Sequence, residues 1–282
     1  MPIALLRGKA HVHVVIIGFA AFPAERKTIF EYENLKGEPH AYPATNINPY
    51  LADARNVVLI KRTQQISGGP EISYGSMAND RRKTDKGLGN LILDAESRAK
   101  LLKENPELKP YVRPFMGSEE FLNGTERWCL WLVNAPPSVL RASPSVMAQV
   151  EAVREAREES NRPETRNLAK TPMLFGEIRQ PSKSYLLVPK VSSETRPYLP
   201  VGFVQPKVIA NGSALIVPNA PLFHFGILSC AMYVAWMRYT CGRMKSDYQY
   251  SSQAARRTEW WATRVDGPAG SRERWCLCPP RW

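Results

Sequence analysis

The apolar residues of this chain are gathered in short runs that are separated by polar segments. Runs in which apolar residues alternate with polar ones, or follow one another without a break, predict strands at residues 11–19, 28–32, 56–62, 127–133, 185–191, 199–204 and 214–218. The stretch from Gly37 to Ala54 is rich in Pro, Asn and Gly, which predicts a loop. Gln64 to Asn90 is polar with scattered glycines, which predicts a long exposed loop.

Helical patterns lie between these runs. Asp94 is placed to cap a helix that runs through Leu102 and that Pro106 terminates. The longest pattern runs from Ser145 to Ser160, and its buried stripe consists of valines at three- and four-residue spacing, namely Val146, Val150 and Val153. Short strands mixed with helices of this length predict an irregular α+β fold.

Two apolar stretches have to be distinguished from export and membrane signals. Arg7 and Lys9 precede VHVVIIGFAAFPA, as in a signal peptide, but His13 interrupts the apolar run and the alternation favours a buried strand. The stretch from Leu222 to Met237 is shorter than the roughly 20 residues that a bilayer-spanning helix requires. We expect a buried helix over Phe223–Cys241, and no membrane partner.

Composition adds the class of partner. The chain has 282 residues, of which 44% are hydrophobic, so it can bury a core. Its net charge of +12 favours a polyanion, nucleic acid before an anionic membrane surface. Five cysteines without a C-x-x-C pair indicate reduced thiols in the cytoplasm and no zinc site: Cys129, Cys230, Cys241, Cys276 and Cys278.

The sequence lacks the signatures of the commonest enzyme sites. It contains no G-x-x-x-x-G-K-[ST], no G-x-G-x-x-G, no H-E-x-x-H and no G-x-S-x-G. His11 and His13 lie on a predicted strand, where a core or edge position is expected rather than a metal ligand. Asn48-Pro49-Tyr50 and Asn134-Ala135-Pro136-Pro137-Ser138 only approach the [DN]-P-P-[YF] motif of amino-methyltransferases and read better as turns. We expect neither catalytic residues nor metal ligands.

Side chains suited to DNA are instead spread over residues 161–196. Arg and Lys suit phosphates and guanine, Asn and Gln suit adenine, and Glu can accept from cytosine. A solvated charged face would have the same composition. The candidate DNA-contacting residues are Arg162, Arg166, Arg179, Gln180, Lys190, Ser192, Ser193, Glu194 and Arg196.

Glu194 and Arg196 are the strongest pair among these candidates. The predicted strand at 185–191 ends just before them and Pro197 stops ladder pairing, so we expect an exposed turn. In an extended chain, side chains two residues apart point to the same side and could address neighbouring bases. The alternative is a mutual surface ion pair.

Many runs of this chain resemble the MmeI-like DNA methyltransferases of bacterial restriction–modification systems, over about residues 7–251 and in consistent order. These runs include RGKAHVHVVIIGF (7–19), NINPYL (46–51), GNLIL (89–93), YVRPFMGSEEFLNG (111–124), RWCLWLV (127–133), TPMLFGEIRQP (171–181), YLLVPKVSSETRPYLPVGF (185–203), VIANGSALIVPNAPLFHFGIL (208–228) and MRYTCGRMKSDYQYS (237–251). Such enzymes join an endonuclease, an adenine-N6 methyltransferase and a target recognition domain in one chain.

The resemblance implies a division of the chain into three parts. Residues 1–20 look like the last strand of a class I methyltransferase sheet, left over from the catalytic domain. Residues 21–252 look like the target recognition domain, an irregular mixed-sheet fold with several helices. Residues 253–282 depart from the family: they contain six Arg, no Lys and four of the seven Trp without apolar periodicity, and look like an aberrant, unstructured tail of a truncated gene product.

Three functions follow from this resemblance. The first is a DNA-binding module that reads a site in double-stranded DNA, with Glu194 and Arg196 at the family's E-x-R specificity positions and no catalysis of its own. The second is an adenine-specific methyltransferase whose catalytic half is supplied by a separate methyltransferase or nuclease chain. The third is a non-functional fragment. The parent enzymes use S-adenosylmethionine for methylation and Mg²⁺ for cleavage, and we expect this chain to bind no cofactor itself.

Overall fold

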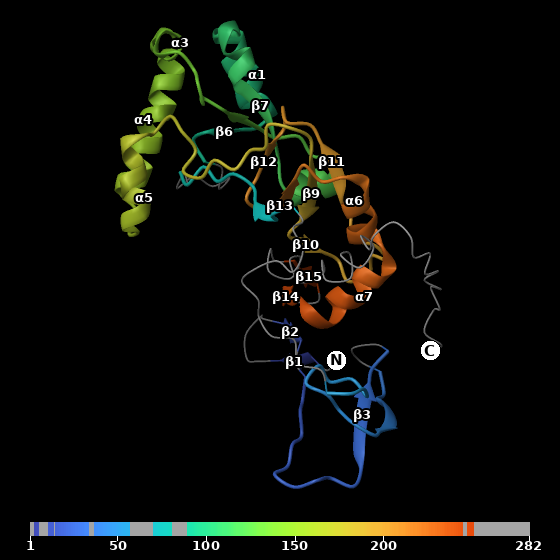
Figure 1. Cartoon of the computed structure of the whole chain (residues 1–282). Coiled ribbons are helices and arrows are strands. Elements are labelled where there is room, and N and C mark those ends of the chain that lie inside the picture. The colour runs from blue at the N-terminus through green and yellow to red at the C-terminus, as the bar shows by residue number, and fades with distance from the viewer. Residues whose placement is uncertain are drawn as a thin grey trace.

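The computed structural model describes residues 3–5, 11–13, 15–33, 37–56, 70–80, 89–244 and 247–250. The predicted strand at 56–62 falls almost wholly outside these residues, as does the C-terminal tail at 253–282. The described part combines helices with several small sheets, which confirms the α+β class. Figure 1 shows these elements along an elongated molecule, with β3 near one end and helices α1, α3 and α4 near the other.

The N-terminal segment contains two antiparallel strand pairs. β1 (Ile3–Leu5) pairs with β2 (His11–His13), and β3 (Lys27–Glu31) pairs with β4 (His40–Ala44). The predicted strand at 11–19 is therefore wrong beyond His13, because residues 15–20 have no regular structure and no sheet neighbour in the described part. The predicted loop from Gly37 to Ala54 is also wrong in part, since β4 lies within it.

A four-stranded antiparallel sheet in the order β11-β9-β13-β5 forms the centre of the fold. Its strands are β9 (Tyr185–Pro189), β11 (Gly202–Val204), β13 (Ala214–Pro218) and β5 (Ser73–Tyr74). Every residue of β9 is buried, which agrees with the continuous apolar run that predicted this strand. The structure thus confirms the strands expected at 185–191, 199–204 and 214–218. The first two are shorter than expected, and the third has the expected bounds.

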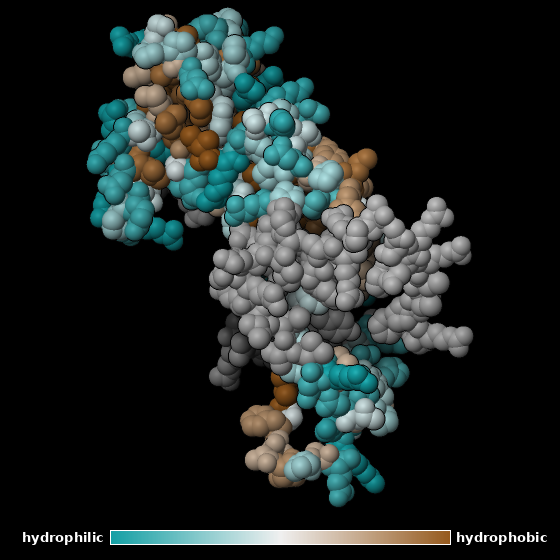
Figure 2. Space-filling model, viewed as in Figure 1, coloured by the Kyte–Doolittle hydropathy of each residue, from teal (hydrophilic) through white to brown (hydrophobic). Residues whose placement is uncertain are grey.

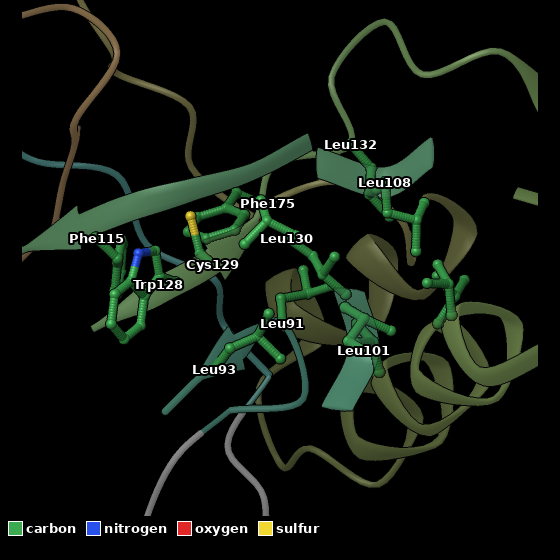
Figure 3. Close-up of a cluster of buried hydrophobic side chains, with 14 of the residues drawn as sticks. Leu91, Leu93, Leu101, Leu108, Phe115, Trp128, Cys129, Leu130, Leu132 and Phe175 are labelled. Carbon is green, nitrogen blue, oxygen red and sulfur yellow. The ribbon is translucent and has the colours of Figure 1, made fainter. Parts of the chain in front are cut away.

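A second four-stranded sheet has the order β12-β7-β8-β6. It consists of β12 (Ile209–Ala210), β7 (Val112–Met116), β8 (Trp128–Leu130) and β6 (Ile92–Leu93), and the β12–β7 pair is parallel. Figure 3 shows side chains from β8 and β6 meeting Leu101 and Leu108 in one cluster. This is a core of its own, separate from the core beneath the central sheet.

Four of the described helices contribute buried residues to this second core: α1 (Ala95–Glu104), the 3₁₀ helix η1 (Pro106–Tyr111), α3 (Pro137–Ala142) and α4 (Pro144–Glu158). The helix α2 (Ser118–Asn123) packs against another core cluster through Phe121, and α5 (Pro163–Asn167) and η2 (Leu168–Lys170) follow α4. Asp94 caps α1 as predicted, accepting a hydrogen bond of 2.8 Å from Ser97 N. The valine stripe of α4 is buried as predicted, and Val146 and Val153 are fully inaccessible.

A three-stranded sheet in the order β10-β15-β14 follows the central one. β10 (Val191–Ser192) continues from β9, and β14 (Gly242–Met244) and β15 (Asp247–Gln249) follow the last helices. The helix predicted over Phe223–Cys241 is divided into α6 (Leu222–Ser229) and α7 (Ala231–Thr240), because Cys230 is extended and its thiol accepts from Tyr233 N. No helix in the described part is long and apolar enough to cross a membrane.

Part of the predicted exposed loop at Gln64–Asn90 is instead a buried connection between the two larger sheets. Ser76 is fully inaccessible and Asp80 is 3% exposed. Gly75 passes so close to Asn211 that a Cβ would lie 2.4 Å from its carbonyl oxygen. The segment is polar because its polar groups bond inside the fold: Ser76 N donates to Ala210 O at 2.7 Å, and Leu91 N donates to the Asp80 carboxylate at 2.9 Å.

Candidate nucleic-acid interface

The turn from Ser193 to Arg196 carries the two residues that the sequence favoured for base reading. Arg196 N donates to Ser193 O at 3.3 Å, and the Ser193 hydroxyl accepts from Thr195 N, so the backbone turns back on itself. Glu194 is exposed and Arg196 is half-buried. The exposed turn is as predicted, but the chain is not extended there, so the argument that both side chains point to one side does not hold.

The two side chains have different partners. Glu194 Oε2 lies 3.4 Å from Nη1 of Arg243 on β14, and Arg196 Nη1 donates to the hydroxyl of Ser192 at 3.2 Å. In the described part of the chain Glu194 is thus paired with Arg243 and not with Arg196. Ser192 is 2% exposed, so its contact with Arg196 helps to anchor the turn to the sheet.

The β10-β15-β14 sheet sets the distance between these partners. Ser192 and Arg243 both pair with Tyr248, from opposite sides of β15, so the three residues form one row across the sheet. Neighbouring strands lie about 4.8 Å apart, which places the backbone positions of Ser192 and Arg243 about 10 Å apart. Glu194 and Arg196 are therefore held at the two ends of this row.

Lys190 lies just before the row and faces another aromatic residue. Its Nζ lies 5.4 Å from the ring centroid of Tyr74 on β5, and its backbone N donates to the hydroxyl of Ser118 at 2.9 Å. The hydrogen bond to Ser118 fixes the backbone of Lys190. The Lys190 side chain, which ends in the ammonium group, is half-buried. This arrangement suits a phosphate contact better than a base contact.

Arg179 and Gln180 are engaged within the fold. Arg179 forms an ion pair with Glu177 and donates to Gly75 O at 3.4 Å. Gln180 donates to the carbonyl oxygens of Pro206 and Val208 and accepts from Ala210 N at 3.0 Å. Both N–H donors of the Gln180 amide, and one of the two lone pairs of its oxygen, are therefore in use. Gln180 is better placed to hold β12 than to read adenine.

Arg162 and Arg166 lie apart from the turn, at the beginning and end of α5. Both side chains are exposed, and Arg166 Nη1 donates to Ser160 O at 2.9 Å. Figure 1 shows α5 at the end of the α4 arm, away from β10 and β14. The structure therefore brings Lys190, Ser192, Ser193, Glu194 and Arg196 together with each other but leaves these two arginines on a separate element.

Sequence reasoning missed Arg243 and Tyr248. Arg243 Cζ lies 4.1 Å from the centroid of the Tyr248 ring, and Tyr248 is 5% exposed, so the ring forms a fixed platform. The short β14 and β15 strands show no apolar run long enough to predict them. The only available signal is the alternation of Tyr248 and Tyr250 with polar residues in DYQYS.

A second missed residue is Arg157, which is fully buried although it lies on the charged pattern of α4. It donates to five carbonyl oxygens in two stretches of the chain, 78–79 and 168–174: those of Ala78, Asn79, Leu168, Thr171 and Leu174. Burial lowers the pKa of this guanidinium, and the nearby carboxylate of Asp80 opposes that shift. Burial likewise raises the pKa of Asp80 above its ordinary value of 3.8, against the hydrogen bond from Leu91 N and the charge of Arg157.

The described residues contain no group of three or more His, Cys, Asp or Glu side chains that could hold a metal ion. The buried carboxylates of Asp80 and Glu120 are both used inside the fold, by Leu91 N at 2.9 Å and by Gly117 N at 2.7 Å. Cys129, Cys230 and Cys241 are free thiols.

Comparison with known proteins relates this arrangement to one family. A family model described as the target recognition domain of MmeI matches residues 53–258. DNA methyltransferase A of Bacillus subtilis (strain 168) is 33% identical over 247 residues, which are 87% of this chain. A solved structure of the Type IIL restriction-modification enzyme MmeI in complex with DNA superposes with a TM-score of 0.75 and 42% identity over 82% of this chain.

The chain spans only a part of these relatives. It covers 27% of the length of DNA methyltransferase A and 30% of the MmeI chain. The matched residues 53–258 include the central sheet, the second sheet, the β10-β15-β14 sheet and every helix described above. The turn at Ser193–Arg196 and the row of Ser192, Tyr248 and Arg243 thus lie inside the matched region.

Proposed function

The chain belongs to the MmeI target recognition domain family, and on that premise we propose that it is the part of an adenine-specific N6 DNA methyltransferase that reads the DNA sequence. Its partner is double-stranded DNA. In this proposal the chain grips the duplex and reads a short site, and a separate catalytic domain acts on the adenine.

The observation that carries the proposal is the turn at Ser193–Arg196. An exposed acid and a half-buried arginine extend from a short turn, and each is tethered to one end of a row of sheet residues. Glu can accept a hydrogen bond from cytosine N4, and Arg can donate two to guanine O6 and N7. A cytosine–guanine base pair presents both groups in the major groove, so Glu194 and Arg196 could read one pair or adjacent pairs. Ser192 and Ser193 hold the turn.

The remaining candidates are assigned to the backbone of the DNA or to the fold. In this proposal Lys190, Arg162 and Arg166 contact phosphates, which supply most of the affinity of such proteins. The exposure of the two arginines supports this role. Arg179 and Gln180 support the fold beneath the interface, because their side chains bond to Glu177, Gly75 and the β12 region. The two arginines of α5 would then contact the duplex at some distance from the turn.

An exchange of side-chain types tests the base-reading role. The variants Glu194→Arg and Arg196→Glu are made singly and together, and binding is measured over a library of duplexes. A changed preference at one or two positions supports readout, and uniformly weaker binding with unchanged preference would reduce both residues to backbone contacts. The matched control is the charge-neutral pair Glu104→Arg and Arg141→Glu, two exposed residues of α1 and α3 that should leave the preference unchanged.

The proposal assigns the S-adenosylmethionine site of the parent methyltransferases to a region outside this chain. The match of residues 53–258 to a target recognition domain, and the 27% of DNA methyltransferase A that the chain covers, support this assignment. Calorimetric titration of the full chain with S-adenosylmethionine should give no binding heat. A saturable heat with 1:1 stoichiometry would place the cofactor site in this chain and contradict the proposal.

A second candidate function is supported by the apolar segment between β2 and β3. Large apolar side chains there are strongly exposed, with Ile16 at 85% and Phe19 at 95%, and Figure 2 shows brown side chains on the loop below β1 and β2. Such a run is a typical contact surface for another protein domain. In this alternative it binds a separate chain that carries the catalytic sheet, and the two chains together methylate adenine.

A complementation assay separates the two candidates. The chain alone, and the chain mixed with a separately produced methyltransferase region of Bacillus subtilis DNA methyltransferase A, are incubated with DNA and radiolabelled S-adenosylmethionine. Methylation only in the mixture, abolished by Ile16→Asp and Phe19→Asp, supports the second candidate. If the mixture does not methylate DNA and the chain alone still prefers one site, the result supports the first candidate, a module that reads DNA.

A further inference from the structure

Arg243 lies between an exposed carboxylate and a buried aromatic ring. Its Nη1 is 3.4 Å from Glu194 Oε2, and its Cζ is 4.1 Å from the centroid of the Tyr248 ring. A further contact of 3.4 Å joins Nη2 to the carbonyl oxygen of Arg238, near the end of α7. The guanidinium is thus held by a strand, a helix end and the turn, although Arg243 itself is exposed.

The platform beneath Arg243 is rigid. Tyr248 is the central residue of the row that Ser192 and Arg243 flank, and it is 5% exposed. The next residue but one, Tyr250, is 3% exposed and its backbone N donates to Lys190 O at 2.7 Å. The sheet that carries Arg243 is therefore joined directly to the strand that leads into the turn, so the position of the guanidinium relative to Glu194 is set by the fold.

A carboxylate at a DNA-binding surface faces two difficulties. It is repelled by the phosphates, and as an exposed side chain with several rotatable bonds it has to be ordered before it can accept a hydrogen bond from a base. A guanidinium 3.4 Å away reduces both, because it offsets the negative charge and favours one orientation of the carboxylate. Glu194 lies 49 positions before Arg243, so only the folded chain provides this partner.

We infer that Arg243 is a positioning residue for base recognition, which holds the carboxylate of Glu194 in the orientation in which it reads DNA. This inference rests on the proposed function, in which Glu194 reads a base. Arg243 in this role contacts neither a base nor a phosphate. Its removal therefore affects the preference at the position that Glu194 reads and leaves the preference at the position of Arg196 unchanged, since Arg196 is held by Ser192.

The experiment compares site preference in four single variants of the full chain, and in the double variant of Glu194→Gln with Arg243→Met, over the same duplex library. Arg243→Met keeps the aliphatic contact with Tyr248 and removes the charge, and Arg243→Lys keeps the charge but not the planar stack. Glu194→Gln identifies the position that Glu194 reads. The control is Arg238→Met, which removes an exposed arginine of α7 with the same change in net charge. Thermal unfolding of each variant checks that the sheet is intact.

The expected result is a loss of discrimination between about 2-fold and 10-fold at the Glu194 position in Arg243→Met, the amount that ordering one flexible side chain represents. Arg243→Lys should lose less. In a Glu194→Gln background, Arg243→Met should add no further loss at that position. If Arg243→Met fails to fold, the same comparison is made with Arg243→Lys.

Three results would overturn the inference. Unchanged preference with uniformly weaker binding would make Arg243 a phosphate contact, and a changed preference at a different position would make it a direct reader of a base. An additive loss in the Glu194→Gln background would show that the two side chains act independently. If Glu194→Gln itself leaves every preference unchanged, the base-reading role of Glu194 fails first and the inference fails with it, a result distinct from the other three.

Discussion

Arg157 on α4 donates a hydrogen bond of 2.7 Å from Nη2 to the carbonyl oxygen of Ala78, which lies 79 positions earlier in the chain. The same guanidinium reaches carbonyl oxygens of Leu168, Thr171 and Leu174. One buried side chain thus joins the connection between the two larger sheets to the arm that carries α5. The position of α5 relative to the rest of the fold depends on it.

Replacing Arg157 should be strongly destabilising. Arg157→Met removes five hydrogen bonds to part-buried carbonyl oxygens and the positive charge near the buried Asp80 carboxylate. We expect a loss of about 3–5 kcal/mol in the free energy of unfolding. Arg157→Lys, with three donors instead of five, should give an intermediate loss. Urea denaturation measures both. Arg154→Met on the same helix, which removes an exposed pair with Glu151, is the control and should cost under about 1 kcal/mol.

The buried carboxyl of Asp80 predicts a pH dependence of stability. Because burial raises its pKa, the folded chain binds this proton more tightly than the unfolded chain does. The contribution of Asp80 to stability should therefore fall as the pH rises from 3.8 toward the raised pKa, and should be constant above it. The difference in unfolding free energy between wild type and Asp80→Asn, measured at a series of pH values, should decrease over this interval. A difference that grows with pH there would contradict the prediction.

DNA binding should weaken steeply with salt, since phosphate contacts release counterions. The logarithm of the affinity falls with the logarithm of the salt concentration, with a slope of about −0.9 for each phosphate that is neutralised. If Arg162 and Arg166 each contact a phosphate, the variant with both replaced by Ala should have a slope smaller by about 2. Fluorescence anisotropy at several salt concentrations measures it. Lys103→Ala, at an exposed lysine of α1, should leave the slope unchanged.

Truncation after Ser252 should leave the described fold intact. The last described residues are already part of the core, since Tyr248 and Tyr250 are 5% and 3% exposed and Tyr250 N bonds to Lys190 O. The truncated chain should keep the cooperative thermal transition of the full chain, whereas a chain ending at Thr240 should lose β14 and β15 and unfold at a lower temperature. Loss of the transition on truncation after Ser252 would make the tail structural.

Elements with a strong local pattern could be predicted from the sequence. The Asp94 cap, the valine stripe of α4 and the apolar run of β9 each specify their structure through nearby residues. Prediction failed where long-range contacts decide the structure. The polar segment at 70–80 is buried because Arg157, Ala210 and Gly212 form hydrogen bonds with it from far along the chain. Strand β4 forms because β3 pairs with it.

In the candidate site, too, the features set by nearby residues could be predicted and those set by long-range contacts could not. The exposed turn at Ser193–Arg196 was predictable, because a strand ends before it and Pro197 follows. Its partners were not, since Arg243 and Tyr248 lie about 50 residues away on strands of three residues each. The alternative of a mutual surface ion pair between Glu194 and Arg196 gives way to two separate contacts, with Arg243 and Ser192, because the β10-β15-β14 sheet holds those partners on either side of Tyr248.

The most direct test of the central claim is selection of bound duplexes by the full chain from a randomised DNA library, followed by sequencing. If the chain is a DNA-reading module, one short site should be enriched, and its duplex should be bound at least about 10³-fold more tightly than a scrambled one at moderate salt. Binding without any enriched site, equal for all duplexes and dependent only on salt, would reduce the chain to a basic protein that grips phosphates and would contradict the account.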